Sequence, residues 1–415
     1  MRFEILAAST ASAARVGRVT TPHGSFDTPA FMPVGTRASV RGLTPRQVRE
    51  TGSQILLNNT YHLLLRPGPE LIERLGGVHR FMNWDGPILT DSGGYQAYSM
   101  ADTNAIDDDG VTFRSTVDGS LIRLTPERAI EVQNALGADI IMAFDDCPPS
   151  VDPASAPEVG RLSEPTPLRL AARRDTRRDR YDHAQRLRVA NERTVRWLER
   201  CKKAHQRADE QALFGIVQGG TDPEQRAWSA QRVCAIDLPG YAIGGVAVGE
   251  SPGQIMQTVR ETAPLLPNDK LRYLMGVGYE RDIVAAVRAG IDMFDCVLPT
   301  RNGRNANAFT PAGQIRLRNA RFAEDPGPID PACDCPACDP DGVGGSDRPV
   351  FSRAYIRHLF MSDEMLGPVL VSLHNVRHFQ RLMLDIRRAV RDDDWLGLGR
   401  RWPVARAGLP GGNGD

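Results

Sequence analysis

The sequence has no excess of charge, no long apolar run and little cysteine. Lys+Arg and Asp+Glu number 51 each, so any nucleic-acid partner must bind a local basic face and not the field of the whole protein. No apolar run approaches the ~20 residues that a membrane helix needs, and no signal-peptide pattern opens the chain. Seven cysteines, three of them clustered, fit a reducing compartment and a metal site better than a disulfide framework. We therefore expect a cytoplasmic protein with no membrane partner.

Eight short apolar runs, each closing on a polar residue or glycine, indicate buried parallel strands. They are AFMPVGT (30–36), SQILLNN (53–59), PILTDSGG (87–94), DIIMAFDDC (139–147), LFGIVQGG (213–220), YAIGGVAVGE (241–250), RYLMGVG (272–278) and DMFDCVLPT (292–300). Helical patterns with start signals such as Thr125-Pro126 and Ser251-Pro252 lie between most of them. This alternation predicts an α/β fold, a (β/α)8 TIM-type barrel over residues 1–305, with the active site at the carboxyl ends of the strands.

Two insertions and a different C-terminal pattern accompany the barrel. The alternating segment 111–124 predicts a hairpin around Asp118-Gly119. The Arg-rich insertion at 161–182, together with the helical pattern that follows it, fits either a solvated helix face or an RNA contact. We expect a zinc-binding subdomain and C-terminal helices over 306–395, and a disordered tail over 402–415.

Polar residues close several of the predicted strands. They are Asp91, Asp145, Gln218 and Asp295, and Gly245 lies at the end of another strand. Any one of these carboxylates could instead cap the next helix, but several at one barrel mouth point to a shared cavity. Glycine pairs after Asp91 and Gln218 allow a flat ligand to approach backbone amides. The glycines in GGVAVG lack dinucleotide-binding spacing, so a Rossmann fold is not expected.

The segment CDCPACD places three thiols, Cys333, Cys335 and Cys338, in the spacing C-x-C-x2-C. Soft thiolate ligands in a closed tetrahedral site favour zinc, with an iron–sulfur cluster as the weaker alternative. A fourth ligand is needed, and His358 and His374 both lie downstream. Spacing alone does not decide which of the two histidines is the fourth ligand.

Seven motifs in a constant order resemble those of the bacterial-type tRNA-guanine transglycosylases. They are DSGGYQ, AFDDC, GIVQGG, GYAIGGVAVGE, YLMGVG, DMFDCVLPTRNGR, and CDCPAC followed by SRAYIRHL and HN. The resemblance runs from about Phe3 to residue 390. It implies exchange of a guanine in the anticodon of particular tRNAs for a 7-deazaguanine, in queuosine biosynthesis, without cutting the strand.

The resemblance also implies roles for the strand-end residues. Asp295 would attack C1′ of the ribose and form a covalent RNA–enzyme intermediate, and Asp91 would be the general acid/base. Asp145 would accept hydrogen bonds from guanine N1 and its amino group, while Gln218 and the Gly245 amide donate to O6. Two aromatic or sulfur-containing side chains would sandwich the base: Tyr95 and Met275. Taken alone, each of these two is more often a core residue.

Further residues follow from the same resemblance. Arg301 and Arg304 would grip the nucleotides beside the target base, although phosphate pairing without specificity is an alternative. The family places the fourth zinc ligand at His374. The single zinc would then be structural and would hold a basic subdomain beside the barrel mouth. The arginines of that subdomain are Arg353, Arg357, Arg377, Arg381, Arg387 and Arg388.

The expected base is 7-aminomethyl-7-deazaguanine (preQ1), with guanine as the leaving base, because bacterial members insert preQ1 whereas eukaryotic members accept the larger queuine. In the family this difference falls at the positions of Cys147 and Val248, and Val246 lines the same wall where leucine is more common. The expected RNA partners are tRNAs with a GUN anticodon, those for Asp, Asn, His and Tyr, and the expected assembly is a homodimer. A non-catalytic RNA-binding relative, a metal-dependent barrel hydrolase and the archaeal relative are the alternatives. The presence of the aspartates argues against the non-catalytic relative, and the absence of an H-x-H after the first strand argues against the hydrolase. The archaeal relative has an extra C-terminal RNA-binding region, for which this chain has no room.

Overall fold

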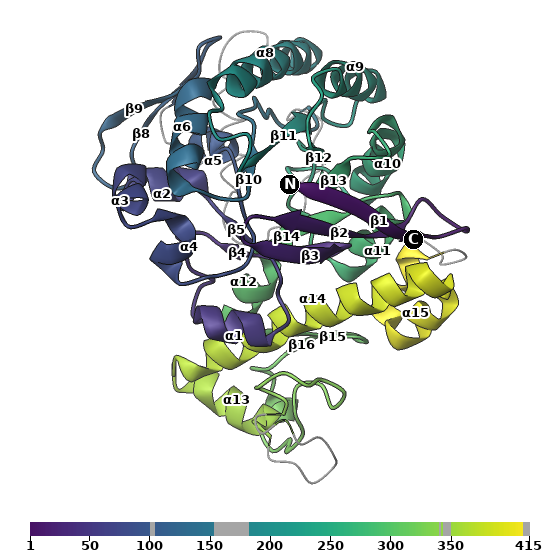
Figure 1. The fold of residues 1–415 in the computed structure, drawn as a ribbon. Helices are drawn as coiled ribbons and strands as arrows, with labels where there is room; N and C mark the ends of the chain where they lie inside the picture. The colour runs from purple at the N-terminus through teal and green to yellow at the C-terminus, as the bar shows by residue number, and fades with distance from the viewer. Residues whose placement is uncertain (100–103, 153–181, 340–341, 343–349, 410–415) are drawn as a thin grey trace.

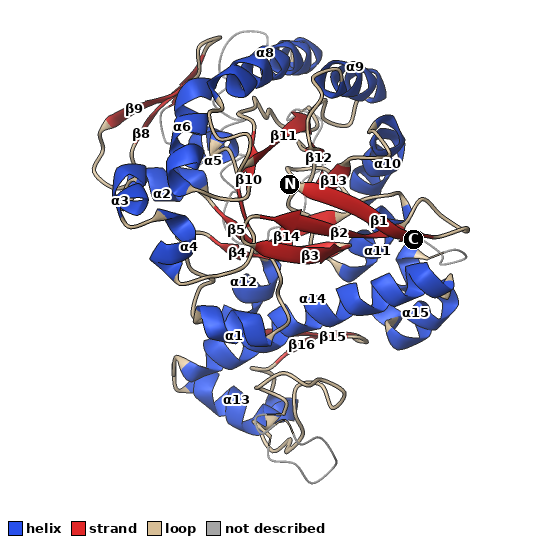
Figure 2. Ribbon diagram, viewed as in Figure 1, coloured by secondary structure: helices blue, strands red, loops and turns tan. Residues whose placement is uncertain are grey.

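The computed structural model describes residues 1–99, 104–152, 182–339, 342 and 350–409. Eight parallel strands close into a barrel in the order β10-β11-β12-β13-β14-β4-β5-β6, which confirms the predicted fold class (Figures 1 and 2). Each strand coincides with one of the eight predicted apolar runs to within one residue at its start, or lies inside it. The strands are β4 (Ala30–Gly35), β5 (Leu56–Asn58), β6 (Ile88–Thr90), β10 (Ile140–Met142), β11 (Ala212–Val217), β12 (Gly240–Ile243), β13 (Leu271–Leu274) and β14 (Met293–Cys296).

Helices surround the barrel and begin at the predicted signals. Thr125 accepts a hydrogen bond from the Arg128 amide at the start of α6, and Ser251 forms a capping box with Gln254 at the start of α10. These helices are α1 (Pro45–Glu50), α2 (Thr60–Leu65), α3 (Pro69–Arg74), α4 (Gly77–Met82), α5 (Gly94–Ser99), α6 (Pro126–Leu136), α8 (His183–Ala204), α9 (Pro223–Cys234), α10 (Pro252–Thr262), η1 (Ala263–Leu265), α11 (Glu280–Arg288) and α12 (Leu298–Arg304). Among the described helices, none is long and apolar enough to cross a membrane.

A small antiparallel sheet closes the amino-terminal end of the barrel. Its strands are β1 (Arg2–Ala8), β2 (Arg15–Thr21) and β3 (Gly24–Thr28), which lie across the barrel in Figure 1. Val19 and Phe26 of this sheet join the apolar interior of the barrel, and buried Arg15 pairs with Asp292 at the amino end of β14. Because this end is closed, a ligand can enter the barrel only from the opposite mouth.

The predicted hairpin region forms a three-stranded antiparallel sheet. Its strands are β7 (Asn104–Ile106), β8 (Val111–Arg114) and β9 (Leu121–Leu124). The Arg-rich insertion at 161–182 lies outside the described residues, except for Asp182, which caps α8. Most of the segment 339–349, which follows the thiol cluster, is also outside them.

The C-terminal region combines a small lobe with a long helix that returns to the barrel. Its elements are β15 (Asn307–Thr310), β16 (Gly313–Arg316), η2 (Ala320–Phe322), α13 (Arg353–Met361), α14 (Leu366–Asp392), α15 (Trp395–Arg401) and η3 (Pro403–Gly408). The Phe379 ring of α14 stacks on Phe31 of β4 at 4.7 Å, so this helix shares the barrel's outer core (Figure 1). The expectation of a disordered tail over 402–415 is wrong for residues 402–409, because Trp402 and Ala405 are buried and η3 packs against α11. Residues 410–415 lie outside the described residues.

Candidate functional site

The alternation of side chains along three barrel strands places three polar residues inside the mouth. Leu89, Ile216 and Met293 belong to the apolar barrel interior. Successive side chains of a strand point to opposite faces, so the residue two positions further along lies on the same inner face. The residues at these positions are Asp91, Gln218 and Asp295, all at the carboxyl ends of the strands.

Asp91 is held by the loop that follows β5. The backbone amide of Thr60 donates to its Oδ1 at 2.8 Å, and the side-chain amides of Asn59 and Gln96 donate to its Oδ2. Burial raises the pKa of Asp91 to about 6, and the nearby charge of Asp295 contributes to the rise. Asp91 is therefore a fixed carboxyl group that can hold a proton close to neutral pH.

Asp295 has a different set of partners. The Tyr273 hydroxyl donates to its Oδ1 at 2.6 Å and the Gly276 amide donates to the same oxygen at 2.8 Å. Burial raises the pKa of Asp295, while these two hydrogen bonds oppose the rise because they favour the ionised form. Asp91 and Asp295 are therefore held by different hydrogen-bond donors.

Asp145 and Gln218 lie side by side at the mouth, because they follow the neighbouring strands β10 and β11. The Gln218 side-chain amide donates to Asp145 Oδ2 at 2.6 Å, and the Ser92 hydroxyl donates to Oδ1 at 3.3 Å. Burial raises the pKa of Asp145 to about 6. Gly245 has φ +62, and a Cβ there would collide with the Gln218 side chain, so only glycine lets this side chain lie against the backbone.

The other predicted base-pocket residues lie around this group. Cys147 and Val246 are buried, while Tyr95, Met275 and Val248 are half-buried. Burial raises the pKa of Tyr95, with contributions from Cys147 and Glu250, which places the phenol close to both residues.

Glu250, which the sequence analysis did not single out, fixes the loop that carries Val248. Its carboxylate accepts from the amides of Ala247 at 2.6 Å and Val248 at 3.0 Å, and from the Ser150 hydroxyl at 2.7 Å. Ala247 has φ +61, a conformation that a non-glycine residue rarely adopts without such support. The glutamate that ends GGVAVGE was the available sequence signal.

Arg226 was also missed, because in sequence it is one charged residue in an amphipathic helix. It is only 1% exposed, and its guanidinium donates to four backbone carbonyls at the ends of β11 and β12. No local signal distinguishes it from the exposed Arg232 of the same helix.

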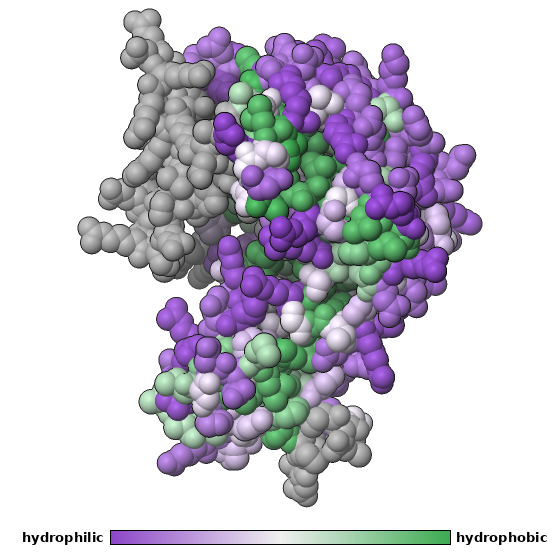
Figure 3. Space-filling view, turned by 90° about the vertical axis from the view of Figure 1, so that its left-hand side faces the viewer, coloured by the Kyte–Doolittle hydropathy of each residue, from purple (hydrophilic) through white to green (hydrophobic). Residues whose placement is uncertain are grey.

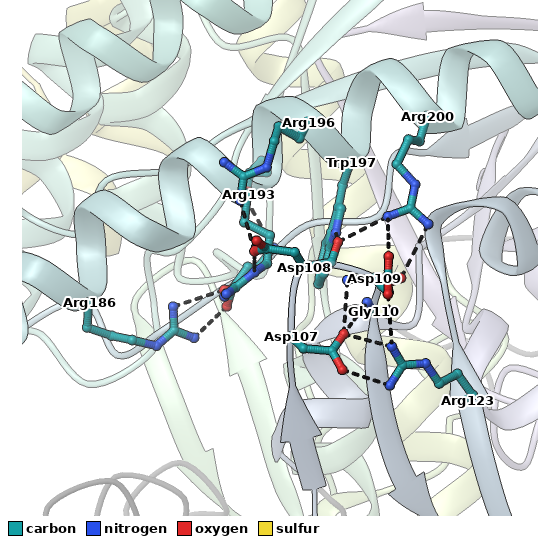
Figure 4. Close-up of polar contacts among 12 residues, drawn as sticks. Asp107, Asp108, Asp109, Gly110, Arg123, Arg186, Arg193, Arg196, Trp197 and Arg200 are labelled. Atoms are coloured by element: carbon teal, nitrogen blue, oxygen red, sulfur yellow. Dashed lines mark hydrogen bonds and ion pairs between the residues drawn. The ribbon is translucent and has the colours of Figure 1, made fainter.

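The arginines of α8 bind acidic groups of the protein (Figure 4). Asp146, next to Asp145, is buried between Arg186 at 2.6 Å and Arg193 at 2.5 Å. Asp108, in the β7–β8 turn, accepts from Arg193 and Arg196. These arginines of α8 therefore bind acidic groups within the protein, an arrangement that differs from both a solvated helix face and an RNA contact.

A different group of arginines lies at the mouth. Burial lowers the pKa of Arg304, and the positive charges of Arg41 and Arg301, which lie within electrostatic range of it, lower this pKa further. Within the described parts of the chain, no carboxylate pairs with any of them. This cluster leaves positive charge free for a polyanion.

Most of the C-terminal arginines expected to form a basic face have partners instead. Arg353, Arg377, Arg381 and Arg388 pair with Asp325, Asp334, Asp330 and Asp385. Arg387 is buried and donates to the Pro29 carbonyl at 2.7 Å. Arg353, Arg377 and Arg381 therefore bind carboxylates of the loop that follows η2, which the sequence did not reveal because that loop and the helices meet only in the folded protein. Arg388 pairs with Asp385 of its own helix and stays largely exposed.

The three thiols and His374 form one buried cluster. The ligand atoms of Cys333, Cys335, Cys338 and His374 all lie within 4.8 Å of one another, so the group could hold a metal ion. His374 Nδ1 is 3.4 Å from Cys338 Sγ, and its Nε2 donates to the Phe309 carbonyl at 2.8 Å, which fixes the ring orientation. His358 is exposed on α13 and takes no part in the cluster.

A second group of potential ligands has the geometry of a hydrogen-bonded cluster. The His23 and His79 rings stack with centroids 3.5 Å apart and planes 12° apart, and each donates to a different oxygen of Asp139 at 2.9 and 3.0 Å. A metal ion lies near the plane of each imidazole that binds it, and two parallel planes at this separation cannot share one ion. This group therefore does not fit a metal.

Chemically, the mouth combines a buried carboxyl group able to hold a proton, a second carboxylate beside it and a carboxylate–amide pair of the kind that recognises a polar heterocycle.

The protein-family model described as Queuine tRNA-ribosyltransferase matches residues 10–184 and 175–406. Proteins named Queuine tRNA-ribosyltransferase are similar over nearly the whole chain. That of Thermus thermophilus is 49% identical over 407 residues, covering 98% of this chain and 94% of the relative. That of Symbiobacterium thermophilum is 51% identical over 391 residues, covering 94% and 88%. The chain therefore belongs to the queuine tRNA-ribosyltransferase family, as the resemblance of its motifs predicted.

Proposed function

We propose that this protein exchanges the wobble guanine of GUN-anticodon tRNAs for preQ1 by double displacement. The observation that carries the proposal is the pair of buried carboxyl groups, Asp91 and Asp295, beside the Asp145–Gln218 pair, with Asp295 close enough to raise the pKa of Asp91. Retaining glycosidases use the same arrangement of nucleophile and acid/base carboxyl groups. The target base must leave the anticodon-loop stack to reach them.

In the first step, a carboxylate oxygen of Asp295 attacks C1′ of the ribose. The C1′–N9 bond breaks, its electron pair goes to guanine, and Asp91 donates the proton that neutralises the leaving base. In the second step, Asp91 takes a proton from the incoming base, whose nitrogen attacks C1′ and displaces the Asp295 ester. The two inversions give net retention. The raised pKa of Asp91 suits a group that must both give and take a proton.

Base recognition is assigned to the groups beside these two carboxylates. Asp145 would accept from the base N1–H and amino group, and Gln218 and the Gly245 amide would donate to O6. In the described structure Gln218 and Asp145 bond to one another, so the base would replace this contact with its own. Tyr95 and Met275 would cover the two faces of the ring.

RNA binding is assigned to the mouth arginines Arg301 and Arg304. They are positively charged, follow the proposed nucleophile by six and nine positions, and have no acidic partner in the described residues. We assign the tRNAs for Asp, Asn, His and Tyr as substrates because their anticodons are the GUN set.

Zinc is the metal proposed for the Cys333, Cys335, Cys338 and His374 cluster. Three thiolates and one imidazole make a complete tetrahedral set, which suits structural zinc and leaves no position for a reacting water. The ion would join the loop after η2 to α14, which itself packs on the barrel.

A homodimer is proposed as the assembly. Apolar side chains are exposed on the C-terminal lobe, with Met361 57% and Met365 83% exposed, and Figure 3 shows hydrophobic side chains at the surface of this lobe. An exposed apolar patch of this kind is typical of a protein–protein interaction site. Light scattering at several concentrations tests the assembly, and a monomer at all of them would contradict it.

The test of the function is incorporation of labelled guanine. Incubation with a GUN-anticodon tRNA should place the label at the wobble position, and unlabelled preQ1 should then displace it irreversibly. A tRNA identical except for adenine at that position is the matched control and should take up no label. Equal labelling of both RNAs, or none of the first, would refute the proposal.

A further inference from the structure

Arg226 of α9 is a buried cation that donates hydrogen bonds to neutral backbone carbonyls. Its Nε donates to the Gly220 carbonyl at 2.7 Å, its Nη1 to those of Val217 at 3.0 Å and Gly244 at 2.7 Å, and its Nη2 to that of Gly245 at 3.2 Å. In the described part of the chain, no carboxylate forms an ion pair with it. Its fork of donors thus joins the loop after β11 to the loop after β12.

A buried guanidinium without a paired carboxylate is costly, so its position requires a reason. Burial lowers the pKa of Arg226 to about 10, which still leaves the side chain charged at neutral pH. The carbonyls that it binds flank Gln218 on one strand and include Gly245 on the other. The same helix holds Gln218 a second time, because the Ser229 hydroxyl accepts from the Gln218 backbone amide at 3.0 Å.

The two loops are in contact where the arginine joins them. The Gln218 side chain lies against the backbone of Gly245, where a Cβ would collide with it. A small change in the separation of β11 and β12 at this level would therefore move the Gln218 amide relative to the Gly245 amide. Arginine is suited to fixing that separation because its planar donors reach several carbonyls at once, whereas lysine offers one nitrogen.

We propose that Arg226 is a positioning residue that sets the spacing between the Gln218 side-chain amide and the Gly245 backbone amide, and thereby the enzyme's affinity for the O6 edge of its base. The inference rests on the proposed function, in which these two amides donate to O6. Arg226 itself does not touch the base and acts through the backbone.

The test compares Arg226→Lys with Arg232→Lys, an exposed arginine at the other end of α9 that lies over the Trp228 ring. In Arg226→Lys, we expect the KM for guanine to rise about tenfold, because weakening one hydrogen bond to the base reduces affinity by about that factor. The KM for tRNA should change less than about twofold. Arg232→Lys should change neither. A general loss of folding would lower both kinds of affinity together.

A double-mutant cycle identifies the route of the effect. In a Gln218→Ala background, one of the two O6 donors is already absent, so Arg226→Lys should raise the guanine KM by clearly less than in the wild type. Full additivity would overturn the proposal, as would an unchanged guanine KM or an Arg226→Lys protein that does not fold. Failure of the wild type to exchange guanine would instead overturn the proposed function, and the inference with it.

Discussion

Replacing Asp145 by asparagine should make the protein more stable at neutral pH while removing its function. Burial raises the pKa of this carboxyl group to about 6 from an ordinary value of 3.8. A shift of this size corresponds to about 3 kcal/mol of unfavourable free energy when the group is ionised in the folded state. Asparagine cannot ionise and avoids this cost.

The hydrogen bonds of Asp145 should survive the change. The asparagine oxygen can accept from the Gln218 amide, which donates to the carboxylate at 2.6 Å, and its NH2 group can face the oxygen of the Ser92 hydroxyl. The variant therefore removes a charge and leaves no new cavity.

The sign of the pH dependence follows from the raised pKa. Below pH 3.8 the wild-type carboxyl group is protonated in both the folded and the unfolded protein, so the variant gains nothing. As the pH rises towards 6, the unfolded state ionises first and the wild type loses stability. The advantage of Asp145→Asn should appear between about pH 4 and pH 6 and remain constant above that range.

Calorimetric melting at several pH values measures this. The unfolding entropy of a 415-residue chain is roughly 0.9 kcal/mol per kelvin, so 3 kcal/mol raises the Tm by about 3 °C at pH 7.5 and by almost nothing near pH 4. Asp269→Asn, at an exposed position before β13, is the matched control and should show no such difference. Guanine exchange should fall at least about 10²-fold, because asparagine cannot accept from both base donors. A variant that is less stable at pH 7.5, or one with the same offset at every pH, would refute the reasoning.

Asp295→Asn should abolish the RNA–protein adduct trapped under denaturing conditions; an adduct that persists would transfer the nucleophile role to Asp91. Asp91→Asn should slow guanine exchange by on the order of 10²-fold or more, and an unchanged rate would remove it from the proton chemistry. Elemental analysis should find one zinc per chain in the wild type and in His358→Ala but not in His374→Ala, with RNA binding lost before chemistry. The wild type should use preQ1 at least about tenfold better than queuine in kcat/KM, and Val248→Gly should narrow that gap because it removes bulk from the path of the larger base. Equal use of queuine by the wild type would contradict the bacterial assignment.

The sequence by itself determined the barrel, because the information for each strand and helix is local. Strands buried on both faces read as continuous apolar runs, and Thr125 and Ser251 mark helix starts through hydrogen bonds that span three residues. The polar residues at the strand ends were visible for the same reason. The motifs also sufficed to recognise the family.

Contacts between distant residues were decided by the tertiary structure. Gln218 bonds to Asp145 across 73 positions, and Cys338 meets His374 across 36, through closure of the barrel and the return of α14. Arg226 looks like any solvated helix residue until α9 packs on the ends of β11 and β12, where four carbonyls surround it. Some arginines bind internal carboxylates, while others, such as Arg301, have no acidic partner among the residues that the structure describes. Which of the two applies depends on where separate segments of the chain meet in space. The place where segments meet is set by the packing of whole helices and strands. The spacing of residues within a single helix or strand carries no information about that packing.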